Sequence, residues 1–233
     1  EWAHLDALCR IPISRFNRDR DVFQYLASEV LPNLGERAAA GGEGEIRAWS
    51  IGCGGGEECY SLTILWRLLL APSLPGITLR VLGTDADPDQ LARARLACYP
   101  GGSLKEMPLA WRQPAFEERS GRFCLRPEFQ AGVELQQQDI RRELPNDSFH
   151  LVLCRNLAFT YFEEDLQREI AAAIRNRLVP GGVLVLGKHE RLPPGAVGFV
   201  ELAPHLRIYR KADNGNTQGR YRNRCERRSL SPM

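Results

Sequence analysis

Polar residues and glycines gather directly after four short apolar stretches of the sequence. The glycine cluster 52–56 follows the first stretch, and Asp85, Asp139 and the pair Arg155-Asn156 follow the other three. If these stretches are parallel strands of one sheet, their carboxyl ends share an edge, and ligands bind beyond that edge. The spacing therefore predicts a single binding site that draws on all four places.

The glycine cluster favours a cationic ligand over a phosphate. Glycines let the backbone approach a ligand, and the helix expected after them points its N-terminus at the same place. However, no Gly-Lys-Ser/Thr follows, as a Walker loop requires, and Glu57 occupies the third glycine position of a dinucleotide fingerprint. Glu57 and Glu58 would repel a pyrophosphate. They suit the ammonium and sulfonium charges of S-adenosylmethionine, and Asp85 can accept hydrogen bonds from both ribose hydroxyls.

Each of these acidic residues also has a structural interpretation. Glu57 and Glu58 in the first turn of a helix stabilise its dipole by about 0.3–1 kcal/mol each. Asp85, just before Asp87-Pro88, fits an ordinary turn. The residues alone leave both interpretations open.

Alternating strands and helices predict an α/β fold, a mostly parallel sheet with helices on both faces. The expected strands span 46–51, 77–83, 133–137, 149–154 and 183–186, with a closing antiparallel pair at 197–202 and 206–209. The expected helices span 21–31, which Pro32 ends, and 57–70, 88–98 and 163–178. A soft linker is expected at 35–44, and an irregular insert with a hairpin at 100–129.

The composition is that of a folded globular protein. The 233 residues are 43% hydrophobic and 26% charged, which excludes wholesale disorder. The longest apolar run, 62–71, contains Arg67 and falls short of the roughly 18 residues that a membrane span needs, so no membrane insertion is expected. Seven basic and two acidic residues lie in 210–233, which predicts a basic, solvated and flexible tail rather than a nucleic-acid-binding one.

The seven cysteines form no C-x-x-C pair and are odd in number. Such spacing fits neither a zinc site nor a secreted disulfide framework, so no metal is expected. We expect free thiols in a reducing compartment, the cytoplasm, with Cys98 and Cys154 as small core residues. No secretory signal opens the chain, which begins at Glu1.

Several collinear blocks resemble the chemotaxis receptor glutamate methyltransferase (CheR) family. They are SRFNRD at 14–19, WSIGC at 49–53, GEECYS at 56–61, GTDAD at 83–87, CRNL at 154–157 with YF at 161–162, and PGG at 180–182 with LG at 186–187 and Glu190. The GEE-x-YS and CRN blocks together are the specific part of the resemblance. This sequence departs from the family pattern at Asn17, at 54–55 and at Cys59. It also has one extra residue between Asn156 and Tyr161.

The resemblance implies a class I (Rossmann-like) methyltransferase fold with a seven-stranded, mostly parallel sheet, helices on both faces and a small inserted β-subdomain. It implies S-adenosylmethionine as cofactor and S-adenosylhomocysteine as its product. The residues implied to bind the cofactor are Ser14, Arg18, Gly52, Cys53, Gly54, Glu57, Asp85, Ala86, Asp139, Ile140, Arg155 and Asn156. Arg18 and Tyr161 are implied as catalytic residues, Arg18 to orient a carboxylate and Tyr161 to lie near the transferring methyl.

The same comparison suggests three regions. Residues 1–45 form a helical lead-in with the Ser14/Arg18 motif, 46–211 form the catalytic domain with a reduced β-subdomain at 103–133, and 212–233 form the tail. The expected activity is protein-glutamate (carboxyl) O-methylation, which needs little acid–base help because a carboxylate is already ionised at neutral pH.

Other functions stay open. One alternative is a methyltransferase that acts on a small molecule or another protein group, and another is an adaptor that binds S-adenosylmethionine without turnover. A nucleic-acid substrate is disfavoured, because a DPPY-type motif is absent after the strand at 149–154. The expected partner is therefore a methyl-acceptor protein or small molecule.

Overall fold

A computed structural model describes residues 14–212 of the chain. Within this range lies a seven-stranded sheet in the order β6-β2-β1-β7-β8-β10-β9. The strands are β1 (Glu45–Ile51), β2 (Thr78–Asp85), β6 (Val133–Gln137), β7 (Phe149–Cys154), β8 (Leu178–Leu186), β9 (Phe199–Ala203) and β10 (Ile208–Lys211). The first five strands in this order are parallel, and β10 is antiparallel to both of its neighbours.

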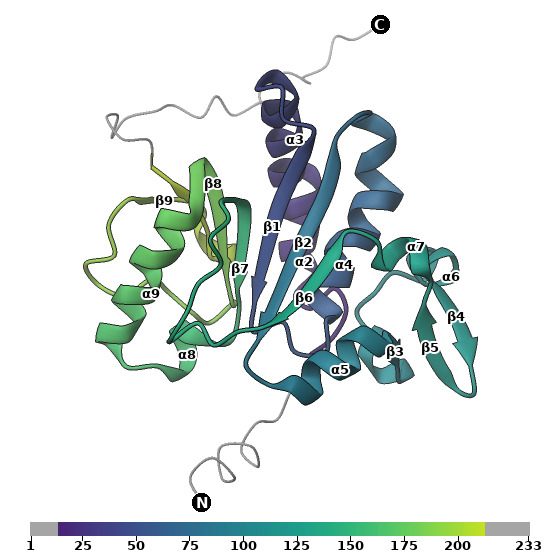
Figure 1. The fold of residues 1–233 in the computed structure, drawn as a ribbon. Helices are drawn as coiled ribbons and strands as arrows, with labels where there is room; N and C mark the ends of the chain where they lie inside the picture. The colour runs from purple at the N-terminus through teal and green to yellow at the C-terminus, as the bar shows by residue number, and fades with distance from the viewer. Residues whose placement is uncertain (1–13, 213–233) are drawn as a thin grey trace, which may run out of the picture.

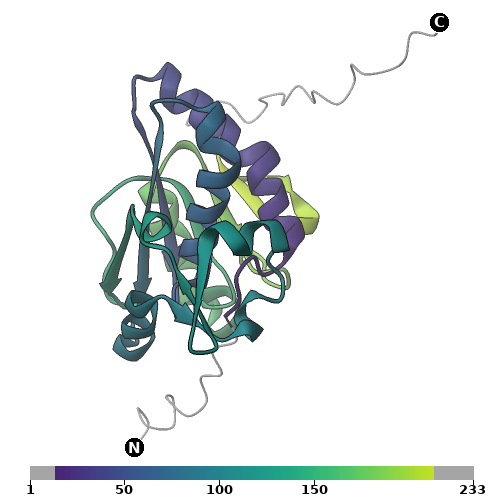
Figure 2. The ribbon, with the colours of Figure 1, turned by 90° about the vertical axis from the view of Figure 1, so that its right-hand side faces the viewer.

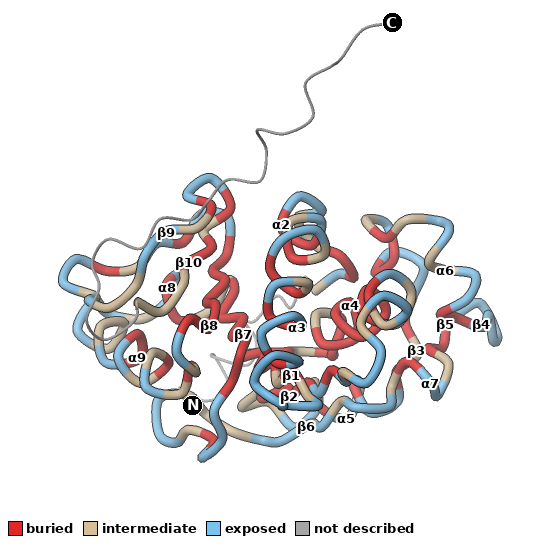
Figure 3. The backbone as a smooth tube through the Cα atoms, turned by 90° about the horizontal axis from the view of Figure 1, so that it is seen from above, coloured by how far each residue is buried: buried red, intermediate tan, exposed pale blue. Residues whose placement is uncertain are grey.

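Helices cover both faces of the sheet (Figures 1 and 3). One layer holds α2 (Arg20–Tyr25), a π turn (Leu26–Val30), α3 (Leu31–Ala40), and α4 (Glu57–Leu65) with a second π turn (Trp66–Leu70). The opposite layer holds α8 (Ala158–Tyr161) and α9 (Glu164–Arg177). Helix α5 (Pro88–Leu96) follows β2 in the chain. Short 3₁₀ turns lie at Ala71–Ser73, Gly101–Leu104 and Pro204–Leu206.

The central strands are buried on both faces, as parallel strands between two helical layers must be. All six residues of β7 are buried, and the strands form the red centre of Figure 3. On one face Phe23 and Leu62 pack in the same core cluster as Val81, and on the other Trp49 packs with Ile170. The sheet is thus a rigid platform, and the carboxyl ends of β1 and β2 lie at its lower edge in Figure 1, beside α5.

The insert between α5 and β6 holds a second, three-stranded sheet in the order β3-β5-β4. Its elements are β3 (Cys98–Tyr99), α6 (Leu109–Ala115), β4 (Phe116–Arg119), β5 (Arg122–Leu125) and α7 (Pro127–Gln130). Its first strand therefore precedes residue 103, where we expected the β-subdomain to begin. The prediction of a hairpin in this region is confirmed.

Cys98 was predicted to be a free core thiol, and this prediction is wrong. The antiparallel pairing of β3 with β5 sets Cys98 opposite Cys124, and the two form a disulfide. The sequence could not indicate this partner, because 26 residues separate the two cysteines. Cys53, Cys59 and Cys154 are free and buried, as expected, whereas Cys9 and Cys225 lie outside the described residues.

The expected helix end at Pro32 is also wrong, and so is the linker expected from residue 35. The helix continues to Ala40, because Pro32 lies at the start of α3, directly after the π turn Leu26–Val30. A proline interrupts a regular helix because it lacks an N–H group, and a wide turn or a first-turn position tolerates it. The other expected strands and helices are present, with ends shifted by a few residues.

The largest of these shifts is in β8, which begins at Leu178 instead of 183. Its pairing with β7 is interrupted, so that Phe149 faces Leu178 but Leu151 faces Val183. Residues 179–182 of β8 form a bulge in this pairing, and Gly181 within it has φ +67°. No helix among residues 14–212 is long and apolar enough to cross a membrane.

Candidate functional site

The glycine loop 52–56 connects the end of β1 to the start of α4. Cys53 donates its backbone N–H to the Thr84 carbonyl (3.0 Å), which ties the loop to the end of β2. Gly54 has φ +53°, and of the atoms in residues 14–212 a Cβ there would have only Gln90 and Ser14 within 4 Å, at 3.9 and 4.0 Å. The backbone at Gly54 is therefore uncrowded and faces Ser14.

Asp85, the last residue of β2, holds this loop in place. Its Oδ2 accepts the Gly54 N–H at 2.8 Å, and its Oδ1 accepts the Asp87 N–H at 2.9 Å. Both oxygens keep a further lone pair, and the side chain is half-buried, so Asp85 can still accept hydroxyl groups. Ala86 follows, and its carbonyl accepts a hydrogen bond from Gln137.

Glu57 is a fully buried carboxylate at the first position of α4. Burial raises the pKa of Glu57, and the neighbouring Arg93 partly offsets this. Arg93 forms an ion pair with Oε1 of Glu57, and Ser14 also helps to lower the pKa of this carboxyl, whereas Oε2 is buried and has no hydrogen-bond partner of normal geometry among residues 14–212. A buried acceptor left without a partner is costly, so Oε2 marks a place where a ligand cation fits.

An entry segment, residues 14–19, runs from the glycine loop along the insert (Figure 2). Phe16 is fully buried and meets Tyr99 and Phe116 edge-on. Asn17 donates its N–H to Ser61 of α4 at 2.9 Å, and Glu106 of the insert accepts the N–H of Asp19 at 3.0 Å.

These contacts hold the segment in place, with Ser14 next to Gly54 and the carbonyl of Arg18 accepting a hydrogen bond from Arg155. Asn17 and Asp19, on either side of Arg18, both have positive φ, at 54° and 59°. Non-glycine residues in this conformation concentrate at functional sites.

Arg155 was expected to line the cofactor site, and its guanidinium has protein partners instead. It donates to Asp19 (2.6 Å), to Glu58 (2.8 Å) and to the backbone carbonyl of Arg18 (3.2 Å), and the side chain is only 3% exposed. Arg155 therefore joins the entry segment to α4. Its Nε is buried and finds no hydrogen-bond acceptor in the described part of the chain.

Asn156 and Leu157 lie in the loop after β7, at the same edge of the sheet. The carboxylate of Glu190 accepts the backbone N–H of both residues, at 2.8 and 3.0 Å. Sequence reasoning included Glu190 only as part of a matching block and gave it no role. The signal that was available is a glutamate that follows the end of a buried strand, next to Gly187.

Asp139 and Ile140 follow β6 and lie next to Asp85 through a hydrogen bond from the Gln138 N–H to the Asp85 carbonyl (3.0 Å). The side chain of Arg141 holds Asp139 at 2.7–3.1 Å and lowers its pKa. Asp139 is thus ionised and directed by Arg141.

Tyr161 is 74% exposed at the end of α8, and its backbone N–H bonds to the Leu157 carbonyl (3.0 Å). The structure thus brings together the predicted residues from the entry segment, the glycine loop and the ends of β2, β6 and β7. The one predicted residue it leaves apart from them is Tyr161.

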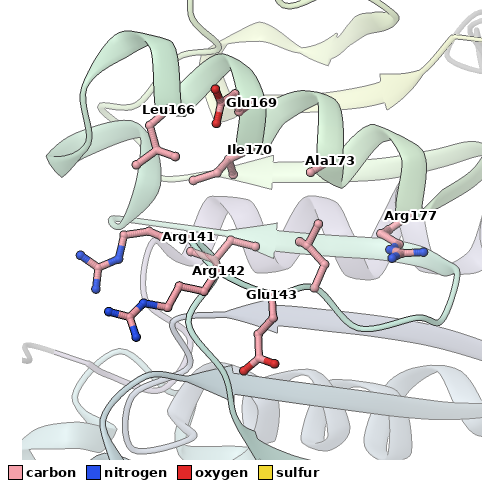
Figure 4. Close-up of a pocket in the computed structure, with 10 residues that line it drawn as sticks. Arg141, Arg142, Glu143, Leu166, Glu169, Ile170, Ala173 and Arg177 are labelled. Atoms are coloured by element: carbon pink, nitrogen blue, oxygen red, sulfur yellow. The ribbon is translucent and has the colours of Figure 1, made fainter.

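A pocket of about 310 Å³ lies between the turn 140–144 and α9 (Figure 4). Leu166 and Ile170 of α9 face the turn, and Arg141 and Arg142 extend away from the helix. Of the predicted site residues only Ile140 lines this pocket. It lacks Glu57 and Asp85, so the site described above is a different one.

His150 lies near the amino end of β7, away from the glycine-loop edge, and has a structural role. Its Nδ1 accepts the Arg47 N–H at 3.1 Å, and its Nε2 lies 3.1 Å from Glu43. Burial lowers the pKa of His150, which keeps the ring neutral. Burial also raises the pKa of the Cys154 thiol well above its usual range, so this cysteine is inert.

The sheet order, with an antiparallel strand inserted beside the far edge strand, is that of the class I methyltransferase fold. The glycine loop follows β1 and Asp85 ends β2, the two places where the resemblance to the methyltransferase family implied the cofactor. Residues 13–204 match the family CheR methyltransferase, SAM binding domain. The chain belongs to this family, and its cofactor is S-adenosylmethionine.

Curated relatives agree with this assignment. A chemotaxis protein methyltransferase of Listeria innocua is 29% identical over 84% of this chain and 72% of its own length. A probable chemotaxis protein methyltransferase of Rhizobium etli is 32% identical over 77% of this chain and 67% of its own. An uncharacterised 104.1 kDa protein of Rhodobacter capsulatus is 29% identical over 90% of this chain, which spans 22% of that protein.

Solved methyltransferase structures are more distant. The amino pentose methyltransferase CalS10 from Micromonospora echinaspora has a TM-score of 0.38 at 23% identity, covering 69% of this chain and 49% of its own. PKMT2 from Rickettsia typhi in complex with AdoHcy has a TM-score of 0.43 at 15% identity, covering 76% and 26%.

The residues present fit the cofactor. Within residues 14–212, Oε2 of Glu57 is a buried acceptor without a hydrogen-bond donor, which suits the ammonium group, and Asp85 has lone pairs left for the ribose hydroxyls. The uncrowded backbone at Gly54 leaves space between them.

Proposed function

We propose that this protein transfers a methyl group from S-adenosylmethionine to a side-chain carboxylate of a protein, as a glutamate O-methyltransferase. The observation that carries the proposal is the entry segment, in which Ser14 lies at the glycine loop and Arg18 stands between two left-handed residues, Asn17 and Asp19. A guanidinium at this place suits a carboxylate, which it binds through two parallel hydrogen bonds. The names of the curated relatives, chemotaxis protein methyltransferases, support a protein acceptor.

The proposed roles divide between cofactor and acceptor. Glu57 would hold the ammonium group, Asp85 the ribose, and Asp139 with Ile140 the adenine. The cofactor supplies a methyl group activated by the positive charge on sulfur. Arg18 would orient the acceptor carboxylate, and Tyr161 would donate a hydrogen bond at the reacting end.

This chemistry needs alignment more than proton transfer. A glutamate carboxylate is ionised at neutral pH, so no base has to remove a proton before the oxygen attacks. The protein contributes by holding the reacting groups in line and by excluding water. The Cys53 thiol does not act as a base, because hydrogen bonding to Cys59 and burial raise its pKa and keep it protonated.

A second candidate function is an adaptor that binds the cofactor without turnover. The exposure of Tyr161, at 74%, favours it, because a residue that meets the transferring methyl is expected to lie within the site. The two candidates share the cofactor site and differ only in methyl transfer.

The test uses cofactor with a labelled methyl group and peptides with a central Glu, Gln or Ser. We expect label on the Glu peptide alone, released as volatile methanol by mild base, because a methyl ester is labile whereas an amine or ether is stable. Arg18→Gln should lose transfer, and Arg15→Gln, the neighbouring arginine that pairs with Glu106 at 3.3 Å, should retain it.

Each other outcome assigns a different function. Base-stable label, or label confined to a small molecule, would replace the carboxyl assignment. Tight cofactor binding with no label on any acceptor would favour the adaptor.

A further inference from the structure

We infer that Glu190 is a positioning residue, which fixes the loop after β7 in the conformation that the cofactor site requires. Its carboxylate is 2% exposed and accepts four hydrogen bonds. The donors are the backbone N–H groups of Gly187 (2.6 Å), Asn156 (2.8 Å) and Leu157 (3.0 Å) and the hydroxyl of Thr160 (2.6 Å). One side chain therefore joins the end of β8 to the loop that follows β7.

Four hydrogen-bond donors stabilise the buried charge of the Glu190 carboxylate. Among residues 14–212, no Lys, Arg or His side chain forms an ion pair with Glu190, so these four neutral donors replace its water shell. Burying a charge is costly unless hydrogen bonds compensate it. Only a carboxylate offers two oxygens that accept all four bonds, since an amide would turn an NH₂ group toward N–H donors.

The loop that Glu190 holds has a strained residue. Asn156 has φ +57°, a conformation that non-glycine residues keep only where their surroundings impose it. The contact with β8 is close, because a Cβ on Gly187 would lie 2.7 Å from both Asn156 Nδ2 and Glu190 Oε2. Glycine at 187 is thus required for the carboxylate to reach the Asn156 amide.

The effect of Glu190 extends to the glycine loop through Leu157. A Cβ on Gly52 would lie 2.7 Å from the Leu157 side chain, so Leu157 packs directly on the first glycine of the cofactor loop. Glu190 holds the backbone of that same leucine. Loss of the carboxylate should therefore disturb both Asn156 and the backbone at Gly52.

This inference rests on the proposed function only through the cofactor site, and its test needs no methyl acceptor. Affinity for S-adenosylhomocysteine is measured by calorimetry, and hydrogen exchange is measured at the Asn156 and Leu157 amides. The variants are Glu190→Gln, Gly187→Ala, which leaves the carboxylate but crowds it, and Thr160→Val, which removes one of the four bonds. Glu43→Gln is the control, a carboxylate lost beside His150 at the other end of β7.

We expect Glu190→Gln to weaken S-adenosylhomocysteine binding roughly ten- to a hundredfold, the effect of losing a hydrogen bond to a charged group. The loop amides should exchange faster while those of Leu151 and Leu153 in β7 stay protected. Gly187→Ala should act in the same direction, Thr160→Val more weakly, and Glu43→Gln should change neither measurement.

Two results would overturn the inference. One is loop amides that stay protected in Glu190→Gln. The other is hydrogen exchange that accelerates uniformly across the sheet in Glu190→Gln, together with an unchanged affinity for S-adenosylhomocysteine. Such a result is expected of a residue that only stabilises the fold. If methyl transfer to carboxylates fails but these measurements behave as expected, only the proposed function falls.

Discussion

Replacing Glu57 by Gln should separate cofactor binding from folding. The side chain is fully buried and pairs with Arg93 through Oε1, and its Oε2 has no hydrogen-bond partner among residues 14–212, so the amide keeps the shape but removes the charge that a bound cation would share with Arg93. A hydrogen bond to a charged group contributes about 1.5–3 kcal/mol. We therefore expect Glu57→Gln to weaken S-adenosylhomocysteine binding roughly ten- to a hundredfold or more.

Folding stability should respond differently. Burial raises the pKa of Glu57 in the folded chain above its value in the unfolded chain. At a pH between these two pKa values, Glu57 is protonated in the folded state and ionised in the unfolded state. Stability from this group therefore falls as pH rises through that window. Glu57→Gln should remove this pH dependence of the free energy of unfolding, and it also loses the ion pair with Arg93, so the test is the pH dependence and not the absolute stability.

Ligand binding should have the opposite pH dependence. The ammonium group needs the ionised carboxylate, so wild-type affinity should weaken as pH falls from neutral through the raised pKa of Glu57, and Glu57→Gln should show no such change. Calorimetry with S-adenosylhomocysteine and urea unfolding provide both measurements. The control is Glu45→Gln, a carboxylate that lies 3.7 Å from Arg80 at the start of β1. Unchanged affinity in Glu57→Gln, or a pH dependence that persists in it, would refute the reasoning.

Three further predictions concern other parts of the chain. Tyr161→Phe should lower kcat about tenfold or more with little change in S-adenosylhomocysteine affinity, and an unchanged kcat would remove Tyr161 from the reaction. Arg155→Ala should destabilise the fold by about 3 kcal/mol, because it leaves buried acceptors without their partner, and a loss below about 1 kcal/mol in urea unfolding would contradict this. Reducing the Cys98–Cys124 disulfide, or the change Cys98→Ser, should lower stability by roughly 3 kcal/mol, whereas equal stability in oxidising and reducing buffers would show that the bond does not constrain the chain.

The sheet and its site edge were predictable because each rests on a local pattern. The strand at 149–154 was expected with the bounds that the structure has, since a continuous apolar run marks a buried parallel strand. The bounds expected for the strand at 133–137 also agree, although the residues of this edge strand are only half-buried or exposed. The glycine loop and Asp85 were located by the same logic, because the carboxyl ends of parallel strands meet at one edge.

The errors came from effects that no local pattern contains. Pro32 ends a regular helix in an isolated sequence, but a preceding π turn lets the chain continue. Cys98 meets Cys124 only because two short strands pair across the insert.

Residue roles were harder to predict than residue positions. Arg155 lies at the predicted edge, but its guanidinium joins Asp19 and Glu58, a partnership between three segments distant in sequence. Glu190 was missed for the same reason, since its four donors come from two loops and its burial is visible only in the folded chain. Motif comparison finds which residues are shared, whereas hydrogen-bond partners decide what each one does.

The most direct test of the central claim is calorimetric titration of S-adenosylhomocysteine into the wild-type protein and into Asp85→Ala. Asp85 both holds the Gly54 amide at 2.8 Å and presents its carboxylate at the proposed ribose position. We predict that the wild type binds one molecule and that Asp85→Ala, although folded, gives no measurable heat of binding. A wild type that does not bind, or an Asp85→Ala variant of unchanged affinity, would contradict the assignment of this site.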